Sequence, residues 1–180
     1  MKSPKVVCLG VHLLDILLKH PEAPVLNPGW QILDDLRITA AGTAAGPAVD
    51  LAKLGAQPIS MGVIGDDYEG GLRVDLMAGF GCDMSRLVRD PGGPTHISLL
   101  FIGPTGERNP IMIRPTGVRE LTLDDIDFDV VADADVLHVG GADQLGGFVG
   151  EPLVELVRHA RRSATIVTVD VLAEVGEHFR

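Results

Sequence analysis

The chain has 180 residues, of which 46% are hydrophobic and only 4% aromatic, and its formal net charge is -10. This length allows a core of its own, while the acidic balance excludes the basic surface of a typical nucleic-acid-binding protein. No apolar run approaches the length of a membrane span, and the first residues lack a secretory signal pattern. Two cysteines far apart, Cys8 and Cys82, favour a reduced, cytoplasmic chain, and no Cys/His spacing indicates a bound metal.

Short continuous apolar runs predict strands that are buried on both faces, as in a parallel sheet. These runs lie at residues 5–10, 58–65, 134–140 and 164–170. Amphipathic segments separate them, including a predicted helix at residues 68–80 with Leu72, Leu76 and Phe80 on one side. The alternation predicts an α/β fold with a doubly wound, mostly parallel sheet.

The segment after the first strand, residues 11–16, contains two polar candidates for a binding site. Ligands of open α/β sheets bind at the carboxyl ends of strands, which is where this segment lies. Asp15 stands among apolar neighbours and could accept hydrogen bonds from substrate hydroxyls, or could simply stabilise a turn. His12 is a weaker candidate, since most histidines in such positions are structural.

Small residues dominate the stretch from Ala40 to Gly46, ahead of a predicted helix that Pro47 begins and Gly55 ends. Because the side chains of Gly42, Ala44 and Gly46 are so small, a ligand could touch the backbone there. The free N–H groups of the helix start would then face it. A tight turn packed against a neighbouring strand explains the same residues equally well.

Three further segments predict a small antiparallel sheet apart from the parallel one. Residues 31–39 alternate between apolar and polar, which indicates a strand with one exposed face. Residues 95–102 and 109–114 flank a turn-rich loop and predict a β-hairpin. A second sheet that interrupts a βαβ series is typical of a lid over a site.

Together these motifs resemble the PfkB, or ribokinase-like, carbohydrate kinases, a family that includes ribokinase, fructokinase and adenosine kinase. The residues that carry the resemblance are, in chain order, 10–15, 41–48, 54–55, 63–70, 103–108 and 137–141. They are similar to the family's Gly-x-x-x-x-Asp, Gly-Gly-x-x-x-Asn-x-Ala, Leu-Gly, Gly-x-Asp-x-x-Gly and Gly-Glu-Arg signatures and to the strand before its substrate cleft. The ordered set is specific, although each motif alone is weak.

The resemblance implies a transferase that moves the ATP γ-phosphoryl group, with Mg, to a hydroxyl of a sugar or related polyol. It places the substrate against Asp15, His12, Gly42, Thr43, Ala44 and Gly46. Residues 1–180 would be the N-terminal portion of one kinase domain, with lid segments at about residues 25–40 and 92–116. The lid also implies a homodimer, and nothing implies a nucleic-acid or membrane partner.

The chain departs from the family pattern at several positions. Ala41 replaces the first signature glycine, Gly46 replaces the usual Asn, and His12 stands where a polar amide is common. The family's Gly-Ala-Gly-Asp motif, whose Asp is the catalytic base, is absent from these 180 residues. We therefore expect no catalytic residue in this chain, little of the ATP site, and no turnover by the chain alone.

Two other functions fit the same residues. A non-catalytic module that binds sugars or nucleosides would use the same cleft, and a nucleoside kinase of the adenosine kinase type would share the fold. The low aromatic content offers few stacking partners for a nucleobase and favours a simple sugar. A dinucleotide-binding dehydrogenase is disfavoured, because the first strand-to-helix turn lacks Gly-x-Gly-x-x-Gly.

Overall fold

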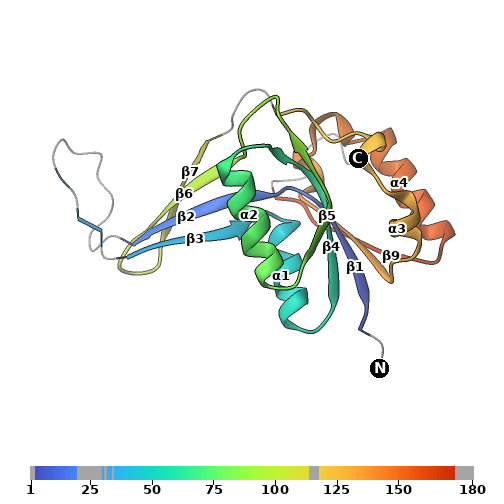
Figure 1. Ribbon diagram of the computed structural model, residues 1–180, viewed down its shortest axis with the longest axis horizontal. Coiled ribbons are helices and arrows are strands. Elements are labelled where there is room, and N and C mark those ends of the chain that lie inside the picture. The colour runs from blue at the N-terminus through green and yellow to red at the C-terminus, as the bar shows by residue number, and fades with distance from the viewer. Residues whose placement is uncertain (1–2, 20–29, 31, 34, 114–117, 173–180) are drawn as a thin grey trace.

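Two sheets divide the molecule in the computed structural model, which describes residues 3–19, 30, 32–33, 35–113 and 118–172. One sheet lies at the centre of a body that has helices on both faces, and the other projects from it (Figure 1). Among the described residues, no helix is long and apolar enough to cross a membrane.

The main sheet has five strands in the spatial order β5-β4-β1-β8-β9, and all its neighbouring pairs are parallel. Its strands are β1 (Lys5–Gly10), β4 (Gln57–Gly65), β5 (Asp83–Asp90), β8 (Val136–Gly140) and β9 (Ile166–Val169). The central strand β1 is buried from Val6 to Gly10, as its continuous apolar sequence predicts. The predicted fold class, a doubly wound and mostly parallel α/β sheet with a smaller second sheet, is confirmed.

Helices cover the main sheet from both sides because alternate residues of its strands point to opposite faces. On one face, Val6 and Cys8 pack with residues of α1 and α2; on the other, Val7 and Leu9 pack with residues of α3 and α4. The helical elements are α1 (Ala45–Lys53), α2 (Tyr68–Gly79), α3 (Phe128–Ala132), α4 (Glu151–Arg162) and the short 3-10 turns η1 (Leu123–Asp125), η2 (Ala142–Gln144) and η3 (Gly146–Phe148).

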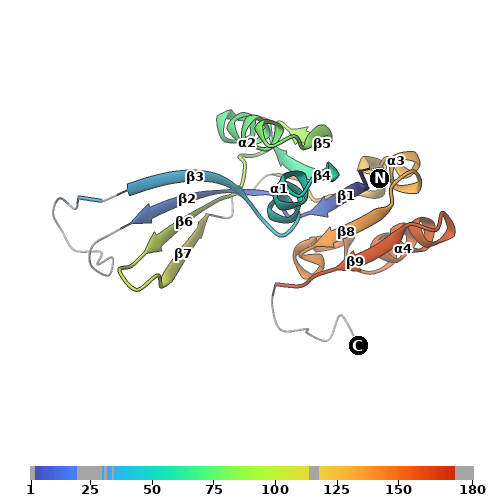
Figure 2. The same ribbon diagram turned by 90° about the horizontal axis from the view of Figure 1, so that it is seen from below.

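The second sheet, which we call the lid sheet, has four strands in the order β3-β2-β6-β7 and extends away from the body (Figure 2). They are β2 (Leu13–Lys19), β3 (Asp35–Ala41), β6 (Ile97–Ile102) and β7 (Arg108–Ile113). The sheet is mixed, not wholly antiparallel, because β2 pairs in parallel with β6. Strand β2 was not expected: only Val11 and His12 separate it from β1, so no turn signal marks the passage into the second sheet.

Strands β3, β6 and β7 overlap the segments 25–40 and 92–116 that the family resemblance implies for a lid, whereas β2 lies outside both. Residues 25–29 and 114–116 of those segments lie outside the described residues.

The apolar side predicted for α2 is not the face that the helix buries. Leu72 and Phe80 are exposed, whereas Gly70, Arg73 and Met77 are buried. The N-terminal turn of α2 is capped by Asp67, whose side chain accepts a hydrogen bond from the Gly70 backbone.

Candidate functional site

The small-residue stretch after β3 folds back onto the point where the chain leaves β1. The Ala44 N–H donates to the Val11 carbonyl over 3.1 Å. Gly42 has φ +105°, and a Cβ there would overlap the Val11 carbonyl oxygen. Glycine is therefore required at this position for both its backbone angle and its close approach.

The same stretch also lies against the carboxyl end of β8. His138 Nε2 donates to the Thr43 carbonyl over 3.1 Å, and a Cβ on Gly140 would overlap that carbonyl oxygen. The Thr43 hydroxyl is buried and has no hydrogen-bond partner in the described part of the chain. Gly42, Thr43 and Ala44 are thus brought together at the carboxyl ends of two adjacent parallel strands, where ligands of α/β sheets bind.

Helix α1 begins directly after these residues and has no side-chain cap. Its N-cap residue is Ala44, and no acidic residue lies in its first turn. Part of the positive end of the helix dipole therefore remains unbalanced by a side chain. A Cβ on Gly46, in this first turn, would meet no atom within 4 Å. The space beside the helix start is open.

Asp15 lies on β2, two residues along the β2-β3 ladder from the Leu13–Ala41 pair that leads to Gly42. The Ser98 hydroxyl on β6 donates to its carboxylate over 2.5 Å. Burial raises the pKa of Asp15, while the Ser98 hydrogen bond and the Arg108 charge oppose that rise. The lid sheet therefore holds a half-buried carboxylate opposite Thr39, three residues before Gly42.

His12 lies apart from these groups. Its ring is 4% exposed and donates through Nδ1 to the Gly10 carbonyl over 2.8 Å. It lies over Gly62 of β4, where a Cβ would come within 2.9 Å of Nδ1. Burial and the Arg73 charge lower the pKa of His12 well below its ordinary value. The imidazole is therefore a neutral interior group, and only its backbone lies beside Gly42.

The Gly-x-Asp-x-x-Gly motif at residues 65–70 connects the body to the lid sheet through Asp67. This carboxylate accepts from the Thr95 backbone over 2.7 Å and from the Thr95 hydroxyl over 2.6 Å. These bonds lower the pKa of Asp67 and outweigh its burial. Since Thr95 lies just before β6, the motif fixes the place where the chain enters the lid hairpin.

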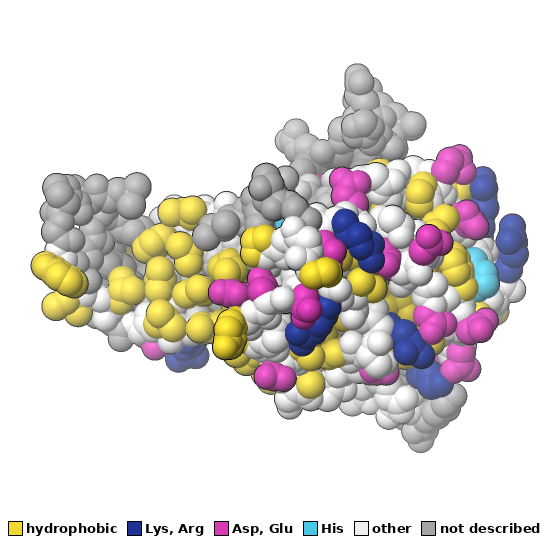
Figure 3. Space-filling model, turned by 45° about the horizontal axis from the view of Figure 1, so that its top comes forward, with side chains coloured by type: hydrophobic (Ala, Val, Ile, Leu, Met, Phe, Trp, Pro, Cys, Tyr) yellow, Lys and Arg dark blue, Asp and Glu magenta, His cyan; other side chains and the backbone are white. Residues whose placement is uncertain are grey.

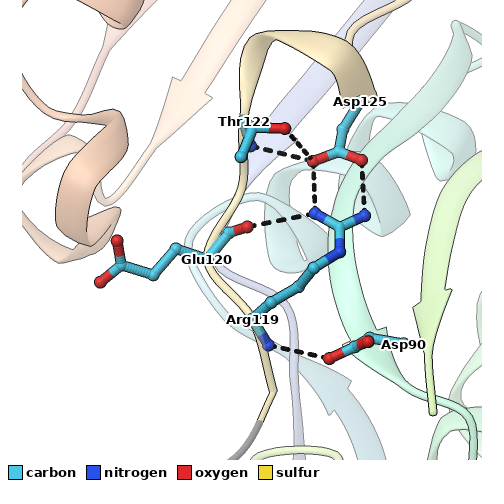
Figure 4. Close-up of polar contacts among 5 residues, drawn as sticks. All are labelled: Asp90, Arg119, Glu120, Thr122 and Asp125. Atoms are coloured by element: carbon cyan, nitrogen blue, oxygen red, sulfur yellow. Dashed lines mark hydrogen bonds and ion pairs between the residues drawn. The ribbon is translucent and has the colours of Figure 1, made fainter. Parts of the chain in front are cut away.

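The chain returns from the lid sheet through a second polar network (Figure 4). Arg119 donates to both oxygens of Asp125 over 2.7 Å, and its backbone N–H donates to Asp90 over 2.8 Å. Asp125 also accepts from the backbone and hydroxyl of Thr122, and these contacts together lower its pKa to about 2. The entry into β6 and the return after β7 are thus both held by buried or charge-assisted hydrogen bonds.

Sequence reasoning missed Ser98 and Arg108. Ser98 is the only polar residue of β6, and that interruption of an apolar run was an available signal. Arg108 starts β7, and its charge reaches Asp15 only through the pairing of strands distant in sequence. Among the described residues, no group of three or more His, Cys, Asp or Glu could hold a metal ion.

Known proteins provide an independent comparison. The chain is 25% identical over 183 aligned residues to fructokinase-1 of Oryza sativa subsp. japonica, covering 97% of this chain and 49% of that protein. It is 29% identical over 132 residues to a 5-dehydro-2-deoxygluconokinase of Photobacterium profundum, covering 72% of this chain and 40% of that protein. The chain therefore spans less than half the length of these relatives.

Solved structures share the fold. A 2-dehydro-3-deoxygluconokinase from Thermotoga maritima superposes with a TM-score of 0.78 at 20% identity, over 96% of this chain and 52% of that one. A fructokinase from Xylella fastidiosa with bound ATP gives 0.72 at 22% identity, over 96% and 53%.

The sequence profile described as pfkB family carbohydrate kinase matches residues 3–179, nearly the whole chain. The chain belongs to the PfkB family of carbohydrate kinases.

Proposed function

We propose that this chain holds the sugar-binding part of an ATP-dependent sugar kinase. The observation that carries the proposal is the packing of residues 42–44 against the carboxyl ends of β1 and β8, with the Asp15 carboxylate on the adjoining strand β2. A polyhydroxyl ligand needs such convergent polar groups within a mostly apolar site. Membership of a carbohydrate kinase family supplies the chemical context.

Each group has a distinct part in the proposed site. Asp15 accepts hydrogen bonds from substrate hydroxyls, and Ser98 fixes the carboxylate in place. The unpartnered Thr43 hydroxyl and the uncapped start of α1 offer polar groups to the sugar. Gly46 leaves room beside the helix start, and Ala44 lines the same turn. His12 contributes through its backbone, because its ring is enclosed in the body.

ATP and Mg enter the proposal from the family, and one structural neighbour is a fructokinase with bound ATP. The described residues do not fit a Mg site of their own, since no suitable cluster of ligands occurs among them. We propose that the 180-residue chain binds the sugar and does not transfer phosphate alone.

The test is a panel of fructose, ribose, deoxy-keto sugar acids and adenosine, scored by the rise in melting temperature that a ligand of the folded state produces. We expect a rise with at least one sugar, and its loss in Asp15→Asn. Asp75→Asn, an exposed carboxylate on α2, is the matched control. A response to adenosine alone would favour a nucleoside kinase, and full sugar binding by Asp15→Asn would contradict the proposed site.

Turnover is tested separately with ATP, Mg and the sugar that binds. We expect no phosphorylated product from the 180-residue chain. Product formation that the chain itself catalyses would contradict this part of the proposal and leave the binding site untouched.

We further propose that two copies of the chain associate through one face of the lid sheet. This apolar lid face consists of Ile16, Leu18, Leu36, Ile38, Leu99, Phe101 and Ile111, which the strand registers place on one side. Leu36, Ile38 and Ile111 are 54%, 40% and 46% exposed. Figure 3 shows hydrophobic side chains gathered over the projecting sheet. Exposed apolar patches of this kind mark interaction surfaces.

Light scattering tests the dimer. Ile38→Glu is expected to shift the chain to a monomer, whereas Arg37→Glu, on the opposite face of the same strand, leaves the dimer intact. A strictly monomeric wild-type chain at high concentration would remove the proposal.

The cysteines support a cytoplasmic location. Cys8 and Cys82 are both free and buried. Burial raises the pKa of Cys8 to about 12, so its reactive thiolate is scarce. Two unpaired thiols suit a reducing compartment.

A further inference from the structure

Three buried polar side chains on the α1 and α2 side of the main sheet have atoms without hydrogen-bond partners. In the described part of the chain, no hydrogen-bond partner lies near four of their atoms: His12 Nε2, Ser60 Oγ, Arg73 Nε and Arg73 Nη1. His12 is 4% exposed, and Ser60 and Arg73 are 0% exposed. Buried polar groups are normally paired with protein, water or a bound ion, so a cluster of orphans requires an explanation.

The pleat of the sheet places these groups in one layer. Ser60 is the registered neighbour of Cys8, which packs with residues of α1 and α2. The ring of His12 lies on Gly62, two residues further along β4 and therefore on the same face as Ser60. Arg73 enters this layer from α2, where its Nη2 donates to the Met77 sulfur over 3.4 Å.

Hydrogen-bond donors exceed acceptors in this cluster. Arg73 presents one unpaired N–H at Nε and two at Nη1, and Ser60 adds a hydroxyl. His12 donates through Nδ1 to the Gly10 carbonyl, so its Nε2 is an acceptor. The Arg73 charge also lowers the pKa of His12, which agrees with a guanidinium close to the ring.

The cluster also carries an unbalanced positive charge. The ion pairs of the described residues do not include Arg73. Burial lowers its pKa to about 9, so the side chain is still cationic at neutral pH. Water can satisfy N–H donors but does not neutralise a buried charge, whereas an anion does both.

We infer that the layer between α2 and β4 holds a small inorganic anion, of the halide class, bound by the Arg73 guanidinium with the Ser60 hydroxyl. The anion joins α2 to the centre of the main sheet beside the residues that lead into the lid sheet. This inference rests on the Arg73 and Ser60 side chains, which the proposed sugar site does not use, so each proposal can fail without the other.

Bromide is a suitable probe because its anomalous scattering identifies it in a crystal. We expect an anomalous peak in contact with Arg73 Nε or Nη1 in wild-type crystals grown with sodium bromide. Ordered water alone at that position, a carboxylate paired with Arg73, or peaks confined to the surface would each overturn the inference.

A solution measurement accompanies the crystal. At constant ionic strength, replacing sodium gluconate by sodium bromide should stabilise the wild-type chain saturably, raising the folded-to-unfolded ratio about 100-fold at 100 times the dissociation constant. Arg73→Met should abolish this response, and Arg161→Met, an exposed arginine on α4, should retain it. Equal responses in both variants would contradict the site. If Arg73→Met does not fold, the anomalous map on the wild-type protein decides.

Discussion

The main sheet and the lid sheet are built from similarly apolar strands, yet they bury them differently. Leu137 and Val139 of β8 are 0% exposed between two layers of helices, whereas Leu36 and Ile38 of β3 remain 54% and 40% exposed. The centre of the main sheet is therefore covered by its own helices, whereas the lid sheet keeps part of its apolar surface exposed. Leucine is thus fully buried at the centre of one sheet and half exposed in the other, where we propose that it contributes to association.

The largest expected effect comes from truncating the same side chain in the two sheets. Leu137→Ala should cost about 3 kcal/mol of unfolding free energy, because it leaves a cavity in the closed core. Leu36→Ala should cost under about 0.5 kcal/mol in the monomer, since the side chain is already half exposed. Urea unfolding at low protein concentration measures both. Equal losses would mean that the two sheets do not differ in this way.

The next largest loss of stability should follow substitution of the glycine at the contact between β8 and the small-residue stretch. A Cβ on Gly140 would overlap the Thr43 carbonyl oxygen, so Gly140→Ala should cost about 2 kcal/mol. Gly71→Ala is the control: it lies in α2 with open space around it and should stabilise by about 0.5–1 kcal/mol. Thermal unfolding of the pair measures the difference, and a harmless Gly140→Ala would show that the close approach is not maintained.

A smaller effect is expected where the chain returns from the lid sheet. Asp125→Asn removes the two-point contact with Arg119 and should cost roughly 1–2 kcal/mol at pH 7. The folded pKa of Asp125, about 2, lies below its unfolded value of 3.8. Its contribution is therefore complete above the unfolded pKa and is lost as pH falls from about 4 toward 2. Unfolding measured across this window should show a shallower pH dependence in the variant than in the wild type; identical profiles would count against the contact.

The smallest effect should follow Gly46→Asn. A side chain there meets open space, so stability should change by less than about 0.5 kcal/mol. Because the amide would stand beside the proposed sugar site, sugar binding should change while the melting temperature of the free chain does not. A large loss of stability would show that this space is occupied.

The parallel strands could be predicted because continuous apolar runs bounded by glycine leave few other interpretations. Strand β2 could not, because Val11 and His12 carry the chain straight from one sheet into the next without a turn signal. The face of α2 was also missed: a hydrophobic pattern favours Leu72 and cannot anticipate that Arg73 is the buried residue.

The sequence nominates residues for the candidate site, but it does not predict their contacts. The glycines and Asp15 are visible in the sequence, and their spacing indicates a family. The approach of Gly42 to Val11 and of Thr43 to Gly140 depends on strands that are distant in sequence and adjacent in the sheet. For the same reason, only the strand register shows Ser98 beside Asp15.

A crystal structure of the chain with the sugar that stabilises it most would test the proposed site. We predict density for the sugar with its hydroxyls within hydrogen-bond distance of the Asp15 carboxylate and of the backbone at residues 42–44. Density for the sugar elsewhere, with Asp15 bonded only to Ser98, would contradict the account.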